Sequence, residues 1–306
     1  MKRKVISLLL VMSMVFSSTM LTGCKKKPEN EPTKTKEQIV IGSVTDIDAN
    51  MMDGWTNGGT NSGIRTLMFG YEPITYTKKG QFVVDKQVTK DFKTTENADK
   101  TKTMTITLQD DLKWNNGEKI TATDYIFSLM LHASPEFIAL QAADTTTFAN
   151  CFVGYEDWHN GKTKTFKGLN IIDEHTFSFT IKAEELPFHF DTAYASFAPY
   201  PIKTIAPDVT ITNSDKGSTI SDNFNIELLK KTISDTKTGY RYNPKVTCGA
   251  YNFDSFDTTS KQVIMTKNDN FKGTHDDVKP TIKKLILKKV NNETASDELR
   301  SGAVDL

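Results

Sequence analysis

The chain has 306 residues, of which 37% are hydrophobic and 25% are charged, so it contains enough apolar side chains for a core and is neither a low-complexity disordered chain nor a membrane-embedded bundle. Lys and Arg together number 38, as do Asp and Glu, but the first 23 residues hold Lys2, Arg3 and Lys4 and no acidic residue. Without this segment 35 basic residues face 38 acidic ones, and the net charge of −3 argues against a nucleic-acid-binding surface.

The N-terminal segment has the pattern of an export signal. Basic residues at positions 2–4 precede an apolar stretch that ends in Leu-Thr-Gly-Cys24. A stretch this short, ending in small residues, is typical of a signal peptide rather than of a membrane-spanning helix. Leu-Thr-Gly-Cys resembles the bacterial lipobox, in which the Cys thiol receives a diacylglyceryl group and becomes the first residue after cleavage; the alternative is a simple anchor helix with a chance Cys. We predict a signal peptide at residues 1–23 and a lipidated Cys24 on the extracytoplasmic face of the cell membrane.

The segment after the lipobox is too polar to join a core. Residues 25–38 carry eight charges and two prolines and no large apolar side chain. As a flexible coil, a segment of this length has a root-mean-square reach of roughly 20 Å, which suits a tether between a membrane and a folded body. We therefore predict a lipidated Cys and flexible tether over residues 24–38.

Two cysteines remain beyond the tether, Cys151 and Cys248, and they are too far apart in the sequence for a CxxC motif. In an exported protein they could form a disulfide, whereas two buried thiols would be ordinary core residues. We favour the thiols.

From residue 39 onward, strand and helix patterns alternate. The apolar run at 39–44 predicts a strand, and the Gly- and Asn-rich segment 54–63 predicts a loop. A helix follows, in which Ile64 and Met68 share one apolar face.

The middle of the chain carries the clearest pattern. Threonine alternates with apolar residues at 103–108, which predicts a half-buried strand. An Asn-Asn-Gly turn at 115–117 is followed by Thr121-x-x-Asp124, which predicts the capped start of a helix that carries apolar residues on one face as far as Ala133.

Further patterns predict a strand at 177–181, a helix at 226–233, and strands at 248–256, 262–267 and 282–290. Strands and helices interleave without a repeat, so we predict an α/β (mixed α+β) fold. We expect one lobe from residues 39–71 and 168–290, with an inserted subdomain at 72–167.

The patterns that would indicate catalysis or metal binding are incomplete. Gly154 and Gly161-Lys-Thr resemble a phosphate loop, but six residues separate the glycines where four are needed. Asp46-x-Asp-x-Asn begins like a calcium loop, but Met51 stands at the glycine position and Asn57 at the glutamate position. The five histidines show no zinc-ligand spacing, and a GxSxG elbow is absent. We predict no catalytic residue, no cofactor and no metal site.

Several segments match, in order, the motifs of one known family. They are residues 67–74, which resemble its L-x-x-x-x-E-x-L helix end; 103–128, which resemble T-F-x-L-R-x-D-x-x-W-x-D-G-x-x-x-T-A-x-D-x-x-F-S; 248–253, which resemble G-x-G-x-Y; 267–273, which resemble R-N-x-x-Y-W/F-G; and 298–305, which resemble x-L-x-S-G-x-x-D. Gln109 replaces the usual Arg, and Asn116 the usual Asp. Together these segments resemble the family 5 extracellular solute-binding proteins, the oligopeptide-binding receptors of ABC importers.

The resemblance implies a periplasmic-binding-protein-like fold of type II, with two lobes and a ligand cleft between them. Residues 291–306 would begin the crossover to a second lobe that is largely missing from this chain. It also implies a monomeric, lipid-anchored receptor that captures peptides or a related small solute and delivers them to the permease subunits of an ABC transporter. A peptide- or pheromone-sensing receptor with the same fold and an exported hydrolase are the alternatives.

The same resemblance places one wall of the cleft at the loop Gly58, Gly59, Thr60 and Asn61. Glycines let backbone groups approach a ligand, and the start of the following helix presents free N–H groups. The alternative is a plain flexible loop.

The resemblance places another wall at the strand Gly249, Ala250, Tyr251 and Asn252. Such a strand pairs with the main chain of a peptide, so its affinity does not depend on the ligand's side chains. The alternative is a wholly buried structural strand. We expect Tyr251 and the Gly58–Asn61 loop to face one shared cleft.

Overall fold

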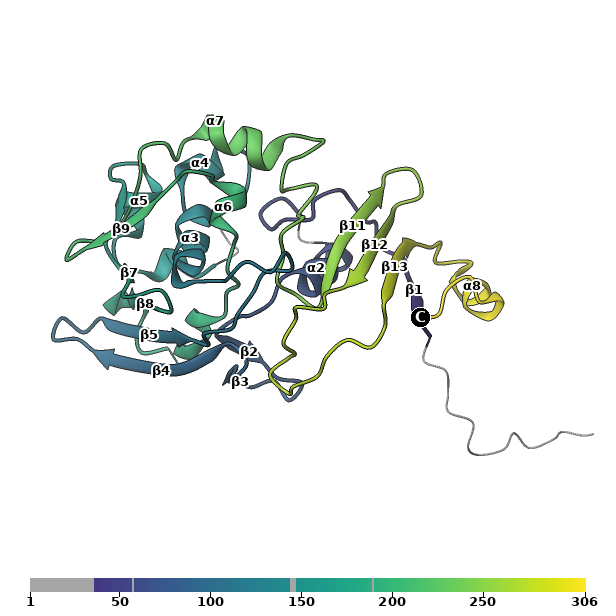
Figure 1. Cartoon of the computed structure of the whole chain (residues 1–306), viewed down its shortest axis with the longest axis horizontal. Helices are drawn as coiled ribbons and strands as arrows, with labels where there is room; N and C mark the ends of the chain where they lie inside the picture. Colours follow the sequence, from purple (N-terminus) through teal and green to yellow (C-terminus); the bar gives the residue numbers. More distant parts are fainter. Residues whose placement is uncertain (1–35, 57, 144–146, 189) are drawn as a thin grey trace, which may run out of the picture. The chain divides into compact units, whose positions relative to one another are not determined.

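The computed structural model describes residues 36–306, apart from residues 57, 144–146 and 189 (Figure 1). The predicted signal peptide, Cys24 and most of the predicted tether lie outside the described residues. The last three tether residues join the folded part, where Lys36 pairs with Asp305 and Glu37 with Lys283.

One sheet contains the first strand of the chain. Its order is β1-β13-β12-β11, formed by strands β1 (Gln38–Ser43), β13 (Lys284–Lys289), β12 (Gln262–Lys267) and β11 (Tyr251–Asp257). β1 runs parallel to β13, and the other neighbours are antiparallel. These four strands confirm the strands predicted at 39–44, 248–256, 262–267 and 282–290. As expected, the strand that begins near residue 39 shares a sheet with the strand that follows Gly249.

A second sheet lies in the middle of the sequence. Its order is β4-β5-β8-β7, formed by strands β4 (Thr89–Glu96), β5 (Lys102–Leu108), β8 (Thr176–Ile181) and β7 (Leu169–Ile171), all antiparallel. The alternating apolar residues of β5 are fully buried, which confirms the predicted half-buried strand. β4 was not predicted, because most of its side chains on both faces are exposed and it shows no apolar alternation.

Helix α3 (Ala122–His132) packs on β7 and β8 of this second sheet (Figure 1). Tyr125 stacks on Phe177 with 5.1 Å between ring centroids. The predicted cap is present, because the Asp124 carboxylate accepts hydrogen bonds from the backbone N–H and the hydroxyl of Thr121, at 2.9 and 3.1 Å. Every residue of α3 except Thr123 is buried.

The remaining strands form a two-stranded hairpin, β2 (Ile74–Tyr76) and β3 (Phe82–Val84), and a small sheet of β6 (Thr165–Phe166), β10 (Gly217–Ile220) and β9 (Ile211–Ser214). Among the described residues, the other α-helices are α2 (Gly59–Met68), α4 (Pro135–Ile138), α5 (Tyr155–His159), α6 (Ile202–Ile205), α7 (Ile226–Leu229) and α8 (Ala295–Ser301). The helix predicted at 226–233 is α7, continued by a π-helical turn over Lys230–Ser234. Within the described residues, every helix is too short or too polar to cross a membrane.

We expected the inserted subdomain to end at residue 167 and the lobe that contains β1 to resume at residue 168. The pairing of the strands does not follow this division. β7 and β8 join the sheet of β5, and β10 pairs with β6, so residues 169–220 pack with the expected insertion rather than with β1. The reason is the apolar face of β8, which lies under α3 and completes the core there.

Two further expectations concern local structure. We expected a loop as far as residue 63, but α2 begins at Gly59. The side chain of Asn61 holds the first turn of the helix against residues 48–50 through two hydrogen bonds. Cys151 and Cys248 are both buried free thiols, as favoured.

Candidate functional site

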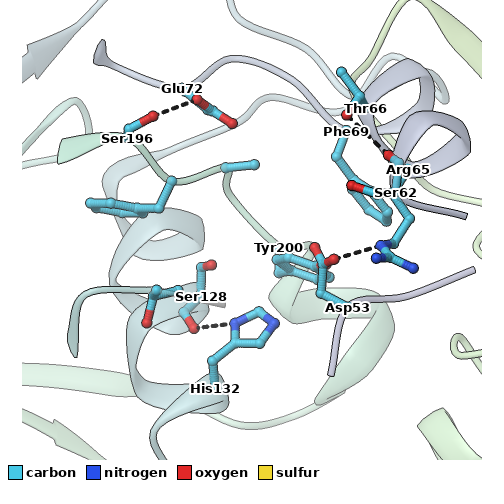
Figure 2. Close-up of a pocket in the computed structure, with 13 residues that line it drawn as sticks. Asp53, Ser62, Arg65, Thr66, Phe69, Glu72, Ser128, His132, Ser196 and Tyr200 are labelled. Atoms are coloured by element: carbon cyan, nitrogen blue, oxygen red, sulfur yellow. Dashed lines mark hydrogen bonds and ion pairs between the residues drawn. The ribbon is translucent and has the colours of Figure 1, made fainter. Parts of the chain in front are cut away.

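A polar cavity of about 150 Å³ lies between α2, α3 and the segment 196–200 (Figure 2). α2 contributes Ser62, Arg65 and Thr66, and α3 contributes Ser128 and His132. We call it the polar cavity. Ser62 and Thr66 are exposed at its rim, whereas the side chains of α3 at its floor are buried.

The position of α2 beside the cavity is set by Asn61. This side chain is 1% exposed, and its amide donates to the backbone oxygens of Asp48 and Asn50, each at 3.1 Å. Its own oxygen accepts from the backbone N–H of Asp48, also at 3.1 Å. The first helical turn is thereby fixed to residues 48–50, and Arg65 follows one turn later on the buried side.

Arg65 forms an ion pair at the wall of the cavity. Its Nε lies 2.6 Å from Asp53 Oδ1, and its Nη2 donates to the backbone oxygen of Thr56 at 2.8 Å. The hydroxyl of Tyr200 donates to the other oxygen of Asp53 at 3.2 Å. Burial, reinforced by the Asp53 charge, raises the pKa of Tyr200 well above its usual value, so this hydroxyl keeps its proton. Asp53 is thus held by one cationic and one neutral donor.

His132 and Ser128 lie one turn apart on α3, and both are 1% exposed. His132 Nδ1 is 2.8 Å from the backbone oxygen of Ser128. A carbonyl oxygen only accepts, so Nδ1 carries the proton and Nε2 presents a lone pair. Burial lowers the pKa of His132, which keeps the ring neutral. His132 Nε2 and Ser128 Oγ have no hydrogen-bond partner among the described residues.

Glu72 marks the other end of the polar cavity. One of its carboxylate oxygens accepts from Ser196 Oγ at 2.7 Å. Burial raises the pKa of Glu72, and the charges of Asp53 and Asp85 raise it further. A second cavity, of about 570 Å³, adjoins here, because Thr66, Phe69 and Glu72 line both.

The larger cavity lies at the C-terminal end of α2. Its walls include Gly249 and Ala250, the β2–β3 hairpin and the segment 271–278. Phe271 stacks on Tyr71 there, with 5.6 Å between ring centroids. The lining is mainly apolar, with acidic groups at Glu72, Asp85 and Asp276.

The predicted loop Gly58–Asn61 divides into two parts. Gly58 and Gly59 are exposed, and a Cβ added to either would meet nothing within 4 Å. Thr60 is half-buried and shares a hydrogen bond with Ser43 at 2.6 Å, and Asn61 has the anchoring role described above. The two glycines therefore lie on an open face of α2, whereas Thr60 and Asn61 hold the helix in place.

The predicted strand Gly249–Asn252 is mostly structural. The backbone N–H of Gly249 donates to Met68 O at 2.7 Å, and Ala250 lines the larger cavity. Tyr251 is 6% exposed, and its hydroxyl donates to Ile282 O at 3.1 Å. The half-buried side chain of Asn252 donates to Lys267 O at 3.3 Å.

The structure does not bring Tyr251 and Gly59 together in one cavity, because neither residue lines the polar or the larger cavity. It brings the Gly249 segment to the C-terminal end of α2 rather than to its start. Tyr251 therefore has a structural role in the sheet instead of forming an aromatic wall.

Sequence reasoning missed the buried polar residues around the cavity. Arg65 lies beside Ile64 on the buried side of α2, and Ser128 and His132 occur in a helix that is otherwise almost wholly apolar and buried. Polar residues in such places are the signal that was available, because burial of a polar group is costly unless it has a partner or a function.

The cavity gathers a serine, a histidine and an aspartate, but not as a catalytic triad. A triad needs the serine hydroxyl hydrogen-bonded to the histidine and the aspartate bonded to the other ring nitrogen. Here His132 Nδ1 binds a carbonyl oxygen, and Asp53 binds Arg65 and Tyr200. In the described part of the chain, no three His, Cys, Asp or Glu side chains are arranged to hold a metal ion. The arrangement is suited to binding by hydrogen bonds.

Comparison with known proteins gives a consistent result. Residues 87–306 match the model of the bacterial extracellular solute-binding proteins, family 5 Middle. An oligopeptide-binding protein OppA of Lactococcus lactis subsp. lactis is 30% identical over 186 residues, which are 54% of this chain and 30% of that protein. The chain therefore spans less than a third of the length of this curated relative.

Two solved structures show the same fold. Lactococcal OppA, complexed with an endogenous peptide in the closed conformation, matches with a TM-score of 0.61 and 19% identity, over 88% of this chain and 44% of that chain. Listeria monocytogenes OppA bound to peptide matches with a TM-score of 0.63 and 18% identity, over 88% of this chain and 46% of that chain. The architecture described above thus corresponds to somewhat under half of each of these binding proteins.

Proposed function

Because the chain belongs to the bacterial extracellular solute-binding proteins of family 5, we propose that it supplies one side of a peptide-binding cleft in the substrate-binding component of an ABC transporter. In this role the protein captures peptides and delivers them to the membrane permease. The proposal is supported by family membership and by two OppA proteins of this fold whose solved structures contain a bound peptide.

The polar cavity is the observation that carries the proposal. Its rim on α2 is exposed, its floor holds buried hydrogen-bonding groups, and the adjoining face of α2 bears glycines without side chains. A peptide that lies along this face can approach the helix closely and place a side chain in the cavity.

A binding role accounts for the site better than an enzymatic one. The buried serine and histidine are not connected to each other or to Asp53 as nucleophile, base and orienting acid. Hydrogen bonds to the peptide main chain and a few side-chain subsites suit a receptor that accepts many sequences.

The test is mass spectrometry of ligands that co-purify with the full-length protein, followed by calorimetric titration of the identified compounds. We expect peptides, bound in a ratio of one per protein. Co-purification of a sugar or a metal chelate, together with no heat of binding for peptides, would contradict the proposal.

We further propose that Cys24 carries the lipid anchor that holds the receptor on the extracytoplasmic face of the cell membrane. The support is the lipobox-like sequence at residues 21–24 and the polar segment that follows it. Cys24→Ala is expected to leave the precursor uncleaved or to release the protein from the membrane fraction, as seen by fractionation and intact mass. If the Cys24→Ala protein is processed to the same intact mass as the wild type, apart from the substituted side chain, and stays in the membrane fraction, this anchor is excluded.

A further inference from the structure

The larger cavity contains a buried carboxylate that has no cationic partner. Asp85 is 7% exposed and lines this cavity. Its Oδ1 accepts from the backbone N–H of Gln87 at 2.8 Å. Within the described part of the chain, Oδ2 accepts no hydrogen bond and the carboxylate forms no ion pair. Buried carboxylates are normally paired with a cation, so the position of Asp85 calls for a partner that these residues do not supply.

The free oxygen of Asp85 is within reach of a ligand. Polar atoms that are both sealed from solvent and without a partner occur elsewhere in the described chain, but Asp85 Oδ2 is not one of them, so it retains accessible surface. The cavity opens at a rim of exposed side chains, which are Tyr76, Lys78, Thr274 and Val278. It also adjoins the polar cavity at Glu72, which lines both. A group that enters from solvent or from the face of α2 can therefore approach Asp85.

Two basic side chains act on Asp85 from a distance, but each is held by another acid. Lys272 pairs with Asp111 at 2.5 Å, and His275 Nε2 lies 3.1 Å from Asp276 Oδ1. Burial raises the pKa of Asp85 by more than its hydrogen bond and the charges of His275 and Lys272 lower it. A raised carboxyl pKa means that the surroundings do not fully compensate the negative charge. A cation inside the cavity would compensate it.

The rest of the larger cavity suits an apolar chain. Its volume of about 570 Å³ lies within the roughly 300–1,000 Å³ of ordinary small-molecule sites. Tyr71 and Phe271, which form the stacked pair in its wall, are 4% and 9% exposed. Tyr71 has a φ of 59°, a left-handed backbone conformation that is rare for a large side chain. Its backbone oxygen accepts from the Tyr125 hydroxyl at 2.6 Å, and its own hydroxyl accepts from the backbone N–H of Lys272 at 2.9 Å, so the ring is held in place.

The surroundings of Asp85 favour an ammonium over other cations. One carboxylate oxygen is already bonded to the N–H of Gln87, whereas a guanidinium binds a carboxylate best through both oxygens. An ammonium is a compact point charge that needs only one. A metal ion needs several ligands, and among the described residues no three His, Cys, Asp or Glu side chains are arranged to hold one. Lys78 at the rim is exposed, so water screens its charge.

We propose that the larger cavity is a binding site for a primary ammonium group on an apolar chain, with Asp85 as its counter-ion. The ammonium donates to Asp85 Oδ2, and the chain lies against the stacked rings of Tyr71 and Phe271. Two sources carry this chemistry, a lysine side chain of a bound peptide and a free alkylamine. The first source rests on the proposed peptide-binding function, and the second is independent of it.

The free source is tested by calorimetric titration of the full-length protein with n-pentylamine. 1-Pentanol has the same chain without the charge, and pentanoate carries the opposite charge. We expect saturable binding of one amine per protein, at least tenfold tighter than binding of the alcohol, and no heat of binding for pentanoate. The reason is that only the amine can pair with the buried Asp85 carboxylate.

The peptide source is tested with pentaalanine that carries a single Lys at each position in turn. Norleucine at the same positions keeps the aliphatic chain and removes the ammonium. At one position we expect the Lys peptide to bind at least tenfold more tightly than the norleucine peptide, because an ion pair inside a cavity is less weakened by water than one on the surface.

Asp85→Asn connects either preference to the cavity. The Asn oxygen can still accept from the N–H of Gln87, so only the charge is lost, and we expect the tenfold difference to fall below twofold. Asp277→Asn is the matched control, because it removes an exposed carboxylate that does not line the cavity, and it should leave the difference unchanged. In the wild type, the pKa of Asp85, followed by its carboxyl ¹³C signal, should fall on addition of the amine, since a bound cation stabilises the ionised form.

The outcomes separate this inference from the proposed function. A preference for the ammonium that is lost in Asp85→Asn supports the site, and the titration in which it occurs identifies the source. Equal affinity for amine and alcohol, together with equal affinity for Lys and norleucine peptides, would overturn the site and leave peptide binding intact. Binding of the amine without binding of any peptide would overturn the proposed function and leave the site standing. A preference that persists in Asp85→Asn would overturn the role of Asp85, and absence of binding for the amine and for every peptide would overturn both proposals.

Discussion

Glycines occur at the start of α2 and at the beginning of the β11 segment, but the two regions use them for opposite purposes. A Cβ added to Gly58, Gly59 or Gly63 would meet nothing within 4 Å. At Gly249 the added Cβ would lie closer than 3.0 Å to backbone atoms of Leu67 and Met68. One region is open space beside a helix, and the other is a contact between two backbones. Glycine in a sequence therefore indicates close approach without saying whether the neighbour is a ligand or the protein itself.

The largest effect is expected where the contact is closed. Gly249→Ala must displace the end of α2, and we expect it to lower the free energy of unfolding by about 3 kcal/mol or more, or to prevent folding. Gly63→Ala, inside α2 and open to space, is the matched control and should raise stability by roughly 0.5–1 kcal/mol through helix propensity. Urea denaturation measures both. If the two variants are equally stable, Gly249 is not in a closer contact than Gly63 and the two regions do not differ in this way.

Helix α3 likewise contains one buried polar side chain that has hydrogen-bond partners and two that have atoms without a partner. The Asp124 carboxylate accepts from Thr121 and from the backbone N–H of Ile202, whereas Ser128 and His132 further along have unpartnered atoms. Burial nevertheless raises the pKa of Asp124 from 3.8 to about 6. A raised carboxyl pKa means that the folded state holds its proton more tightly than the unfolded state does. The stability contributed by this proton is present below pH 3.8 and is lost as the pH rises through about 6.

Asp124→Asn is expected to remove this pH dependence. Relative to the variant, the wild type should lose up to about 3 kcal/mol of unfolding free energy between pH 4 and pH 6, and nothing further above pH 7. Denaturation of both proteins across this pH range measures the difference. A difference that stays constant with pH would show that Asp124 titrates alike in the folded and unfolded chains.

The smallest effects separate ligand contact from structure at the two predicted walls. Gly59→Val places a side chain on the open face of α2, and we expect it to weaken peptide binding by about 1 kcal/mol or more with little loss of stability. Tyr251→Phe removes the hydrogen bond to Ile282 O, and we expect about 1 kcal/mol lower stability with unchanged affinity. Calorimetry and thermal unfolding measure the pair. Reduced affinity in Tyr251→Phe with full affinity in Gly59→Val would reverse the roles assigned here.

Much of the local structure could be predicted from the sequence. Alternation of apolar residues located β5 and β8, strand patterns at 262–267 and 282–290 located β12 and β13, and Thr121 with Asp124 located the start of α3. β4 could not be found in this way, because its side chains are exposed on both faces. The extent of the insertion was also out of reach, because the pairing of β8 with β5 joins segments about 70 residues apart, and local periodicity carries no information about partners.

The sequence by itself determined the family, the interleaved strands and helices, and the glycines that permit close approach, since these depend on residue order and local spacing. Only the tertiary structure decided what each glycine approaches and which polar side chains meet. Asp53, Arg65, His132 and Tyr200 come from four separate segments, and each is unremarkable in its own segment. They meet because α2 and α3 pack beside the segment around residue 200, and burial then leaves some of their polar atoms without a hydrogen-bond partner among the described residues.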